Sequence, residues 1–182
     1  DMTDAAVDAA GAAYAADSVI DLLSEATALV TSGAAFVLAS NSTQTGIIEI
    51  TTTLDTDVTL GATSTGNDLL QALSKLKIEN WRLNLAGTFI DEDYERVIKE
   101  RIVELNLADK VRLLGYLVDD DRDVLLEQTD IFVLPSHSEG MALSVLESAY
   151  FKSALVLTDV GANAEYFGEI TNLIKAGDVQ AL

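Results

Sequence analysis

The sequence contains no cysteine, one histidine and one proline in 182 residues. The absence of cysteine excludes disulfide bonds, thiolate metal sites and a cysteine nucleophile. Because His137 is the single histidine, a metal site with several histidines is excluded, and a Ser-His-Asp triad would have to be built around it. No apolar run approaches the roughly 18–20 residues that span a bilayer, and no signal peptide is visible. We therefore expect a cytoplasmic protein without a membrane span.

Basic residues are scarce and unevenly placed. Lys and Arg number 11 against 30 Asp and Glu, the net charge is -19, and residues 1–74 contain no Lys or Arg. This charge excludes a protein that binds nucleic acid or an anionic membrane surface through its overall field, because both are polyanions. Apolar residues make up 49% of the chain, which is enough for a hydrophobic core and too many for a disordered chain.

The composition changes near residue 57. Residues 1–57 are rich in Ala and Thr, and apolar side chains at helical spacing predict a long acidic helix over about residues 4–31. Apolar and polar residues alternate over residues 47–54, and a second short run over residues 58–62 makes a β-hairpin plausible. We therefore expect an N-terminal segment of helix and strands, residues 1–57, followed by a domain over residues 58–182.

Strand and helix patterns alternate from residue 58 onward. Strands are expected at 58–62, 82–86, 111–115, 131–134, 154–158 and, more weakly, 172–175, and helices at 67–76, 92–105, 121–127 and 143–151. This alternation predicts a three-layer α/β, Rossmann-like domain with a parallel sheet and helices on both faces. Ligands of such sheets bind at the carboxyl ends of the strands, so the loops that follow the strands are the candidate binding loops.

The most informative stretch is residues 131–147, in which a buried strand leads through a polar loop into a helix. Glu139 lies in the loop, and Glu147 follows eight residues later, about two turns into the helix. A carboxylate in the helix can accept hydrogen bonds from a ribose diol, and one in the loop can reach a sugar. His137 fits a polar loop residue better than a catalyst. Free amides at a helix start bind phosphate, and here they would belong to Gly140, Met141, Ala142, Leu143 and Ser144.

These residues resemble the Glu-x7-Glu signature of the retaining, family-4 (group 1) glycosyltransferases of the GT-B fold. Four further segments are similar to that family in the same order, at residues 81–87, 107–115, 158–165 and 176–182. All of them belong to the C-terminal, donor-binding half of the family enzymes. The resemblance covers about residues 58–182, most firmly from residue 69, and it does not extend to residues 1–57.

The resemblance implies a domain that holds a nucleoside-diphosphate sugar without a metal or another cofactor. Glu147 would bind the ribose, and Glu139, the candidate catalytic residue, would lie near the donor sugar. The helix start at residues 140–144 would meet the ribose and the diphosphate. Tyr116 and Leu117 would lie near the base.

Two departures from the family bear on activity. The family places an Arg and a Lys after its first strand to hold the diphosphate, but residues 60–68 contain no basic residue. Each lost charged hydrogen bond weakens binding about 10- to 150-fold. The family's N-terminal half, with the acceptor site and a catalytic histidine, also has no counterpart. We therefore expect a chain that is incomplete as an enzyme, with a missing acceptor domain or partner chain.

Two other interpretations stay open. One is a non-catalytic scaffold, either chimeric, engineered or decayed, that keeps the Rossmann-like fold and binds no ligand. The absent Arg and Lys favour it. The other is an interaction module that works through the acidic N-terminal helix.

Overall fold

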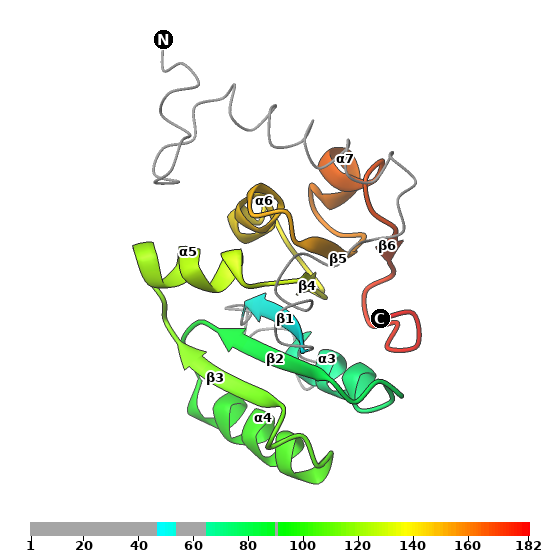
Figure 1. Cartoon of the computed structure of the whole chain (residues 1–182). Helices are drawn as coiled ribbons and strands as arrows, with labels where there is room; N and C mark the ends of the chain where they lie inside the picture. The colour runs from blue at the N-terminus through cyan, green and yellow to red at the C-terminus, as the bar shows by residue number, and fades with distance from the viewer. Residues whose placement is uncertain (1–46, 54–64, 90) are drawn as a thin grey trace.

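The computed structural model describes residues 47–53, 65–89 and 91–182. The helix expected over residues 4–31 and the strand expected over residues 58–62 lie outside these residues. The described elements form one six-stranded sheet flanked by helices (Figure 1). In chain order they are β1 (Ile48–Thr53), α3 (Thr65–Leu73), β2 (Trp81–Ala86), α4 (Glu92–Glu104), β3 (Val111–Gly115), α5 (Asp119–Glu127), β4 (Ile131–Leu134), α6 (Leu143–Tyr150), β5 (Ala154–Thr158), α7 (Asn163–Phe167) and β6 (Leu173–Ile174).

The strand order is β3-β2-β1-β4-β5-β6, and every neighbouring pair is parallel. The chain moves outward from β1 to β3, crosses back to β4 beside β1, and then moves outward in the other direction. The order therefore reverses between β1 and β4, and ligands of open parallel sheets bind outside the carboxyl ends of the strands at such a point. The Rossmann-like α/β fold predicted from the sequence is confirmed.

β1 is a central strand of this sheet. It pairs with β2 over all six of its residues and with β4 at Ile50 and Thr51. Parallel neighbours thus occupy both edges of β1, so the hairpin expected from residues 47–54 and 58–62 is wrong for this strand. The boundary expected at residue 57 lies outside the described residues, but β1, which precedes it, belongs to the same sheet as the strands that follow.

Two apolar clusters hold helices on opposite faces of the sheet (Figure 1). Because side chains alternate across a strand, Val133 of β4 belongs to the cluster beneath α3 and α4, whereas Phe132 and Leu134 belong to the cluster beneath α6. Among the described helices, none is long and apolar enough to cross a membrane.

The second face of β1 is polar, and a buried hydrogen-bond network accommodates it. The Glu49 carboxylate accepts hydrogen bonds from Arg82 Nη1 at 2.8 Å and from Asn84 Nδ2 at 3.0 Å. The Glu49 amide donates to Asp130 Oδ2 at 2.8 Å. Buried polar groups are tolerated when they are bonded in this way. The network joins β1 to β2 and to the residue before β4.

Candidate functional site

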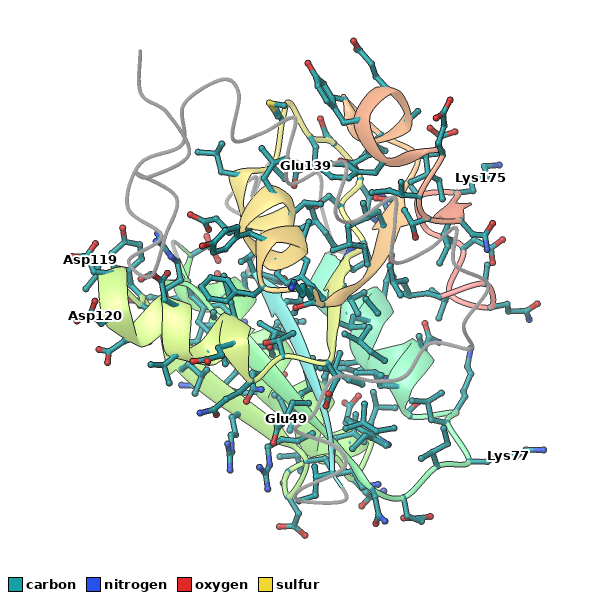
Figure 2. The ribbon with its side chains drawn as sticks, turned by 45° about the horizontal axis from the view of Figure 1, so that its top comes forward. Glu49, Lys77, Asp119, Asp120, Glu139 and Lys175 are labelled. Carbon is teal, nitrogen blue, oxygen red and sulfur yellow. The ribbon has the colours of Figure 1, made fainter. Side chains whose placement is uncertain are left out.

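The loop that carries Glu139 lies between β4 and α6, at the point where the strand order reverses. Figure 2 shows Glu139 beside the start of α6, at the opposite end of the molecule from Glu49. α6 begins at Leu143, so Glu147 lies about one turn into the helix and not two, as expected from the sequence. The helix begins at the residue expected from the sequence, and its start separates Glu139 from Glu147.

The N-terminus of α6 is suited to an anion. No side chain caps it at Ala142, and its first turn contains no acidic residue. Each of the other described helices has at least one acidic residue in its first turn. Gly140, Met141 and Leu143 are exposed, and Ser144 is half-buried. The positive end of the helix dipole is therefore open to solvent on the one described helix that does not neutralise it with acid.

Glu139 is held by hydrogen bonds within and beneath its loop. Ser136 Oγ donates to Glu139 Oε1 at 2.6 Å. Ser136 is buried, and its carbonyl oxygen accepts a hydrogen bond from Thr158 Oγ1 at 2.7 Å. Glu139 is half-buried. One carboxylate oxygen is thus held from β5 through Ser136, which restricts the orientation of the Glu139 side chain.

The loop after β5 also contacts the Glu139 loop. The Ala162 amide donates to the Gly140 carbonyl oxygen at 3.0 Å. Gly161 has a positive φ of 56°, and a Cβ at this position would lie 2.1 Å from the Glu139 carbonyl oxygen. Only glycine permits this close approach of two backbones. The two loops therefore act as one unit at the carboxyl end of the sheet.

His137 connects the Glu139 loop to α3, which packs on the face of the sheet opposite α6. Its Nε2 lies 2.9 Å from Oδ2 of Asp68, which is buried on α3. His137 and Ser136 thus anchor the Glu139 loop to two different elements, α3 and β5.

Glu147 projects from α6 toward α5. Its side chain is 16% exposed, and its Oε1 lies 3.3 Å from Arg122 Nη1. Burial raises the pKa of Glu147 above its usual value, and this effect outweighs the lowering by Arg122, while Asp123 raises the pKa further. Arg122 was not among the residues singled out from the sequence. One feature of the sequence could have marked it, because Arg122 is the one Lys or Arg between Arg112 and Lys152.

The substitution Glu147→Gln is expected to raise the unfolding temperature at neutral pH. Because the folded-state pKa of Glu147 is raised, its ionisation opposes folding: the cost is absent below the unfolded-state pKa, near pH 4, and grows as the pH rises through the folded-state pKa. Gln carries no such cost. Thermal unfolding of both chains at about pH 4 and about pH 7 tests this. A stability difference that does not change with pH would contradict it.

The predicted base-binding residues lie in the segment between β3 and α5. Tyr116 is 75% exposed and Leu117 is half-buried. The following helix, α5, carries the arginine that contacts Glu147. The structure therefore connects this segment to α6 through the Arg122–Glu147 ion pair.

Acidic residues also gather at the start of α5. Asp119, Asp120 and Asp121 form its first turn and are exposed, and Figure 2 shows the first two at one end of the helix. Acids at this position are favoured by the helix dipole. Within the described part of the chain, no three His, Asp or Glu side chains are grouped so that they could hold a metal ion.

Comparisons with known proteins point to one family. The family model described as "Glycosyl transferases group 1" matches residues 65–182. The lipopolysaccharide core mannosyltransferase LpcC of Rhizobium leguminosarum bv. viciae is 32% identical over 87 residues, which are 47% of this chain and 24% of that protein. The mannosylfructose-phosphate synthase of Agrobacterium fabrum is 34% identical over 106 residues, 53% of this chain and 23% of that protein. The aligned part of the chain thus spans about a quarter of these relatives.

Solved structures share the fold. HepE of Anabaena, in a complex with UDP and glucose, has a TM-score of 0.62 and 19% identity over 88% of this chain and 42% of that chain. The isolated C-terminal domain of LpcC from Francisella tularensis has a TM-score of 0.58 and 19% identity over 85% of this chain and 82% of that domain. The chain therefore shares the fold of an isolated C-terminal glycosyl transferase domain and of less than half of the HepE chain.

Proposed function

We propose a function from the premise that the chain belongs to the glycosyl transferases group 1 family. The proposed function is that of the nucleotide-sugar donor-binding half of a retaining, family-4 glycosyltransferase, which transfers a hexosyl group when an acceptor half is supplied. One observation carries it. Glu139 and Glu147 stand on either side of the acid-free N-terminus of α6, at the point where the strand order reverses. The family match supports this assignment.

The proposed roles follow the chemistry of each group. The Glu147 carboxylate accepts hydrogen bonds from the ribose hydroxyls, and the helix start at residues 140–144 binds the diphosphate. Glu139, fixed by Ser136 at 2.6 Å, lies near the donor sugar. The segment with Tyr116 and Leu117 lies near the base. The complex of HepE with UDP and glucose supports a nucleotide sugar as the ligand class.

We propose that donor binding is weak and that this chain does not transfer a sugar by itself. Residues 1–74 contain no Lys or Arg, so the loop between β1 and α3 offers no cation to the diphosphate. The amides of α6 remain as the anion site. The acceptor half would come from a further domain or a partner chain. The lack of basic residues also favours the second candidate, a scaffold that binds no ligand, and the following experiment separates the two.

Nucleotide sugars are expected to stabilise the chain against heat. A ligand at about 100 times its Kd adds about 2.7 kcal/mol, which raises the unfolding temperature of a domain of this size by about 5–10 °C. The probes are UDP-glucose and GDP-mannose, each compared with the free diphosphate. The ligand-induced shift should vanish in Glu147→Gln and persist in Glu127→Gln, which changes an exposed residue of α5.

Each outcome assigns or removes a role. If the ligand-induced rise in unfolding temperature persists in Glu147→Gln, Glu147 does not bind the ribose. A Glu139→Gln variant should keep the shift with UDP and lose the additional shift that the sugar confers. If no donor raises the unfolding temperature at concentrations up to the millimolar range, the second candidate is correct and the chain is a scaffold that binds no ligand.

A further inference from the structure

Arg122 bridges two acidic side chains at the edge of the proposed donor site. Its Nη1 lies 3.3 Å from Glu147 Oε1, and its Nη2 donates to Asp123 Oδ1 at 3.2 Å. All three side chains are partly shielded, with 38% of Arg122, 16% of Glu147 and 26% of Asp123 exposed. The three side chains form a row of alternating charge that extends from α5 to the middle of α6.

The role proposed for Glu147 depends on its charge state. An ionised carboxylate can accept a hydrogen bond from each hydroxyl of a ribose diol, whereas a protonated carboxyl has a donor at one of its oxygens. Burial on α6 raises the pKa of Glu147 and so favours the protonated form. A nearby cation is the means by which such a buried acid stays ionised.

The groups that act on Glu147 are few. Arg122 lowers its pKa and Asp123 raises it, and both belong to α5. On α6 itself, the one other residue with a titratable side chain is Tyr150, one turn further along, and Glu139 stands in the loop before the helix. Arg122 is thus the one cation that acts on this carboxylate within the described part of the chain.

We propose that Arg122 is a positioning residue of the donor site, which holds the Glu147 carboxylate charged and directed toward α5 so that the pair, rather than Glu147 alone, recognises the ribose. This inference rests on the proposed function and deepens it. Asp123 fixes the guanidinium in turn. Because α5 follows the segment with Tyr116 and Leu117, the same ion pair sets the position of that segment relative to α6.

The test uses Arg122→Gln and Arg122→Lys in the full chain. In Arg122→Gln, the affinity for UDP-glucose should fall about tenfold at acidic pH, and the loss should shrink as the pH rises and Glu147 ionises. UDP-glucose is the probe because its diphosphate diester does not change charge over this range. Arg122→Lys should retain most of the affinity. Arg96→Gln, which breaks an exposed pair with Asp93 on α4, should bind as the parent chain does.

A second measurement needs no ligand. Carboxyl NMR of the free chain follows the ionisation of Glu147, which should occur at a higher pH in Arg122→Gln than in the parent or in Arg96→Gln. An unchanged titration of Glu147, or an affinity loss that is the same at every pH, would overturn the proposal. If the parent binds no nucleotide sugar, the proposed function fails, and the NMR titration still decides whether Arg122 controls Glu147.

Discussion

Replacement of Gly161 by Ala is expected to lower the free energy of unfolding by about 3 kcal/mol. The residue has a φ of 56°, and a Cβ would lie 2.1 Å from the Glu139 carbonyl oxygen and 2.6 Å from that of Gly140. Both atoms belong to backbone, so no side chain can rotate away. The two loops would have to separate, which would also break the bond from the Ala162 amide to Gly140.

Gly115→Ala is the matched control for this substitution. Gly115 has a φ of 70°, and no atom lies within 4 Å of a Cβ built there. Its replacement carries the cost of left-handed backbone, about 1 kcal/mol, without a clash. Thermal unfolding should show a loss of about 6–12 °C for Gly161→Ala and about 2–4 °C for Gly115→Ala. Equal losses would mean that the contact between the two loops does not stabilise the fold.

The second large effect is expected at Glu49, far from the candidate site. Glu49→Ala should lower the free energy of unfolding by about 3 kcal/mol. The substitution leaves buried Asn84 without its acceptor and removes the counter-ion of Arg82. Both lie on β2 beside β1, so the loss falls on the central pairing of the sheet.

Glu104→Ala provides the comparison for a surface ion pair. Glu104 contacts Arg101 at 3.0 Å on α4, but 63% of its side chain is exposed. Exposed pairs contribute about 0–1 kcal/mol. Denaturant unfolding of both variants measures the difference. If Glu49→Ala costs no more than Glu104→Ala, the side-chain network does not stabilise the sheet, and backbone pairing with β2 and β4 together with the packing of Ile50 would hold β1 in place.

Most regular elements could be predicted because their signals are local. The bounds expected for the strands at residues 111–115, 131–134 and 154–158 are those that the structure shows, and α4 and α6 each end one residue earlier than expected. Alternation at period 2 and at period 3.6 needs only a few neighbouring residues. α7 was missed because five residues are too few for such a period.

The place of β1 could not be predicted in the same way. Its alternation of apolar and polar residues is compatible with an edge hairpin or with a central strand, and nothing local separates the two. What separates them is a partner far along the chain, because Glu49 bonds Asp130 across 81 residues of sequence. The roles of Glu139, Glu147 and the helix start stay predictions, whereas Arg122 entered the site through the structure alone.

The sequence by itself determined the α/β class, the family and the loop that carries Glu139, because hydrophobic period and motif spacing are properties of neighbouring residues. It also determined the lack of basic residues before residue 75. Only the tertiary structure decided that β1 lies between β2 and β4, that Gly161 packs on Glu139, and that Arg122 faces Glu147. These are contacts between segments far apart in sequence, and they form only when the sheet brings the segments together.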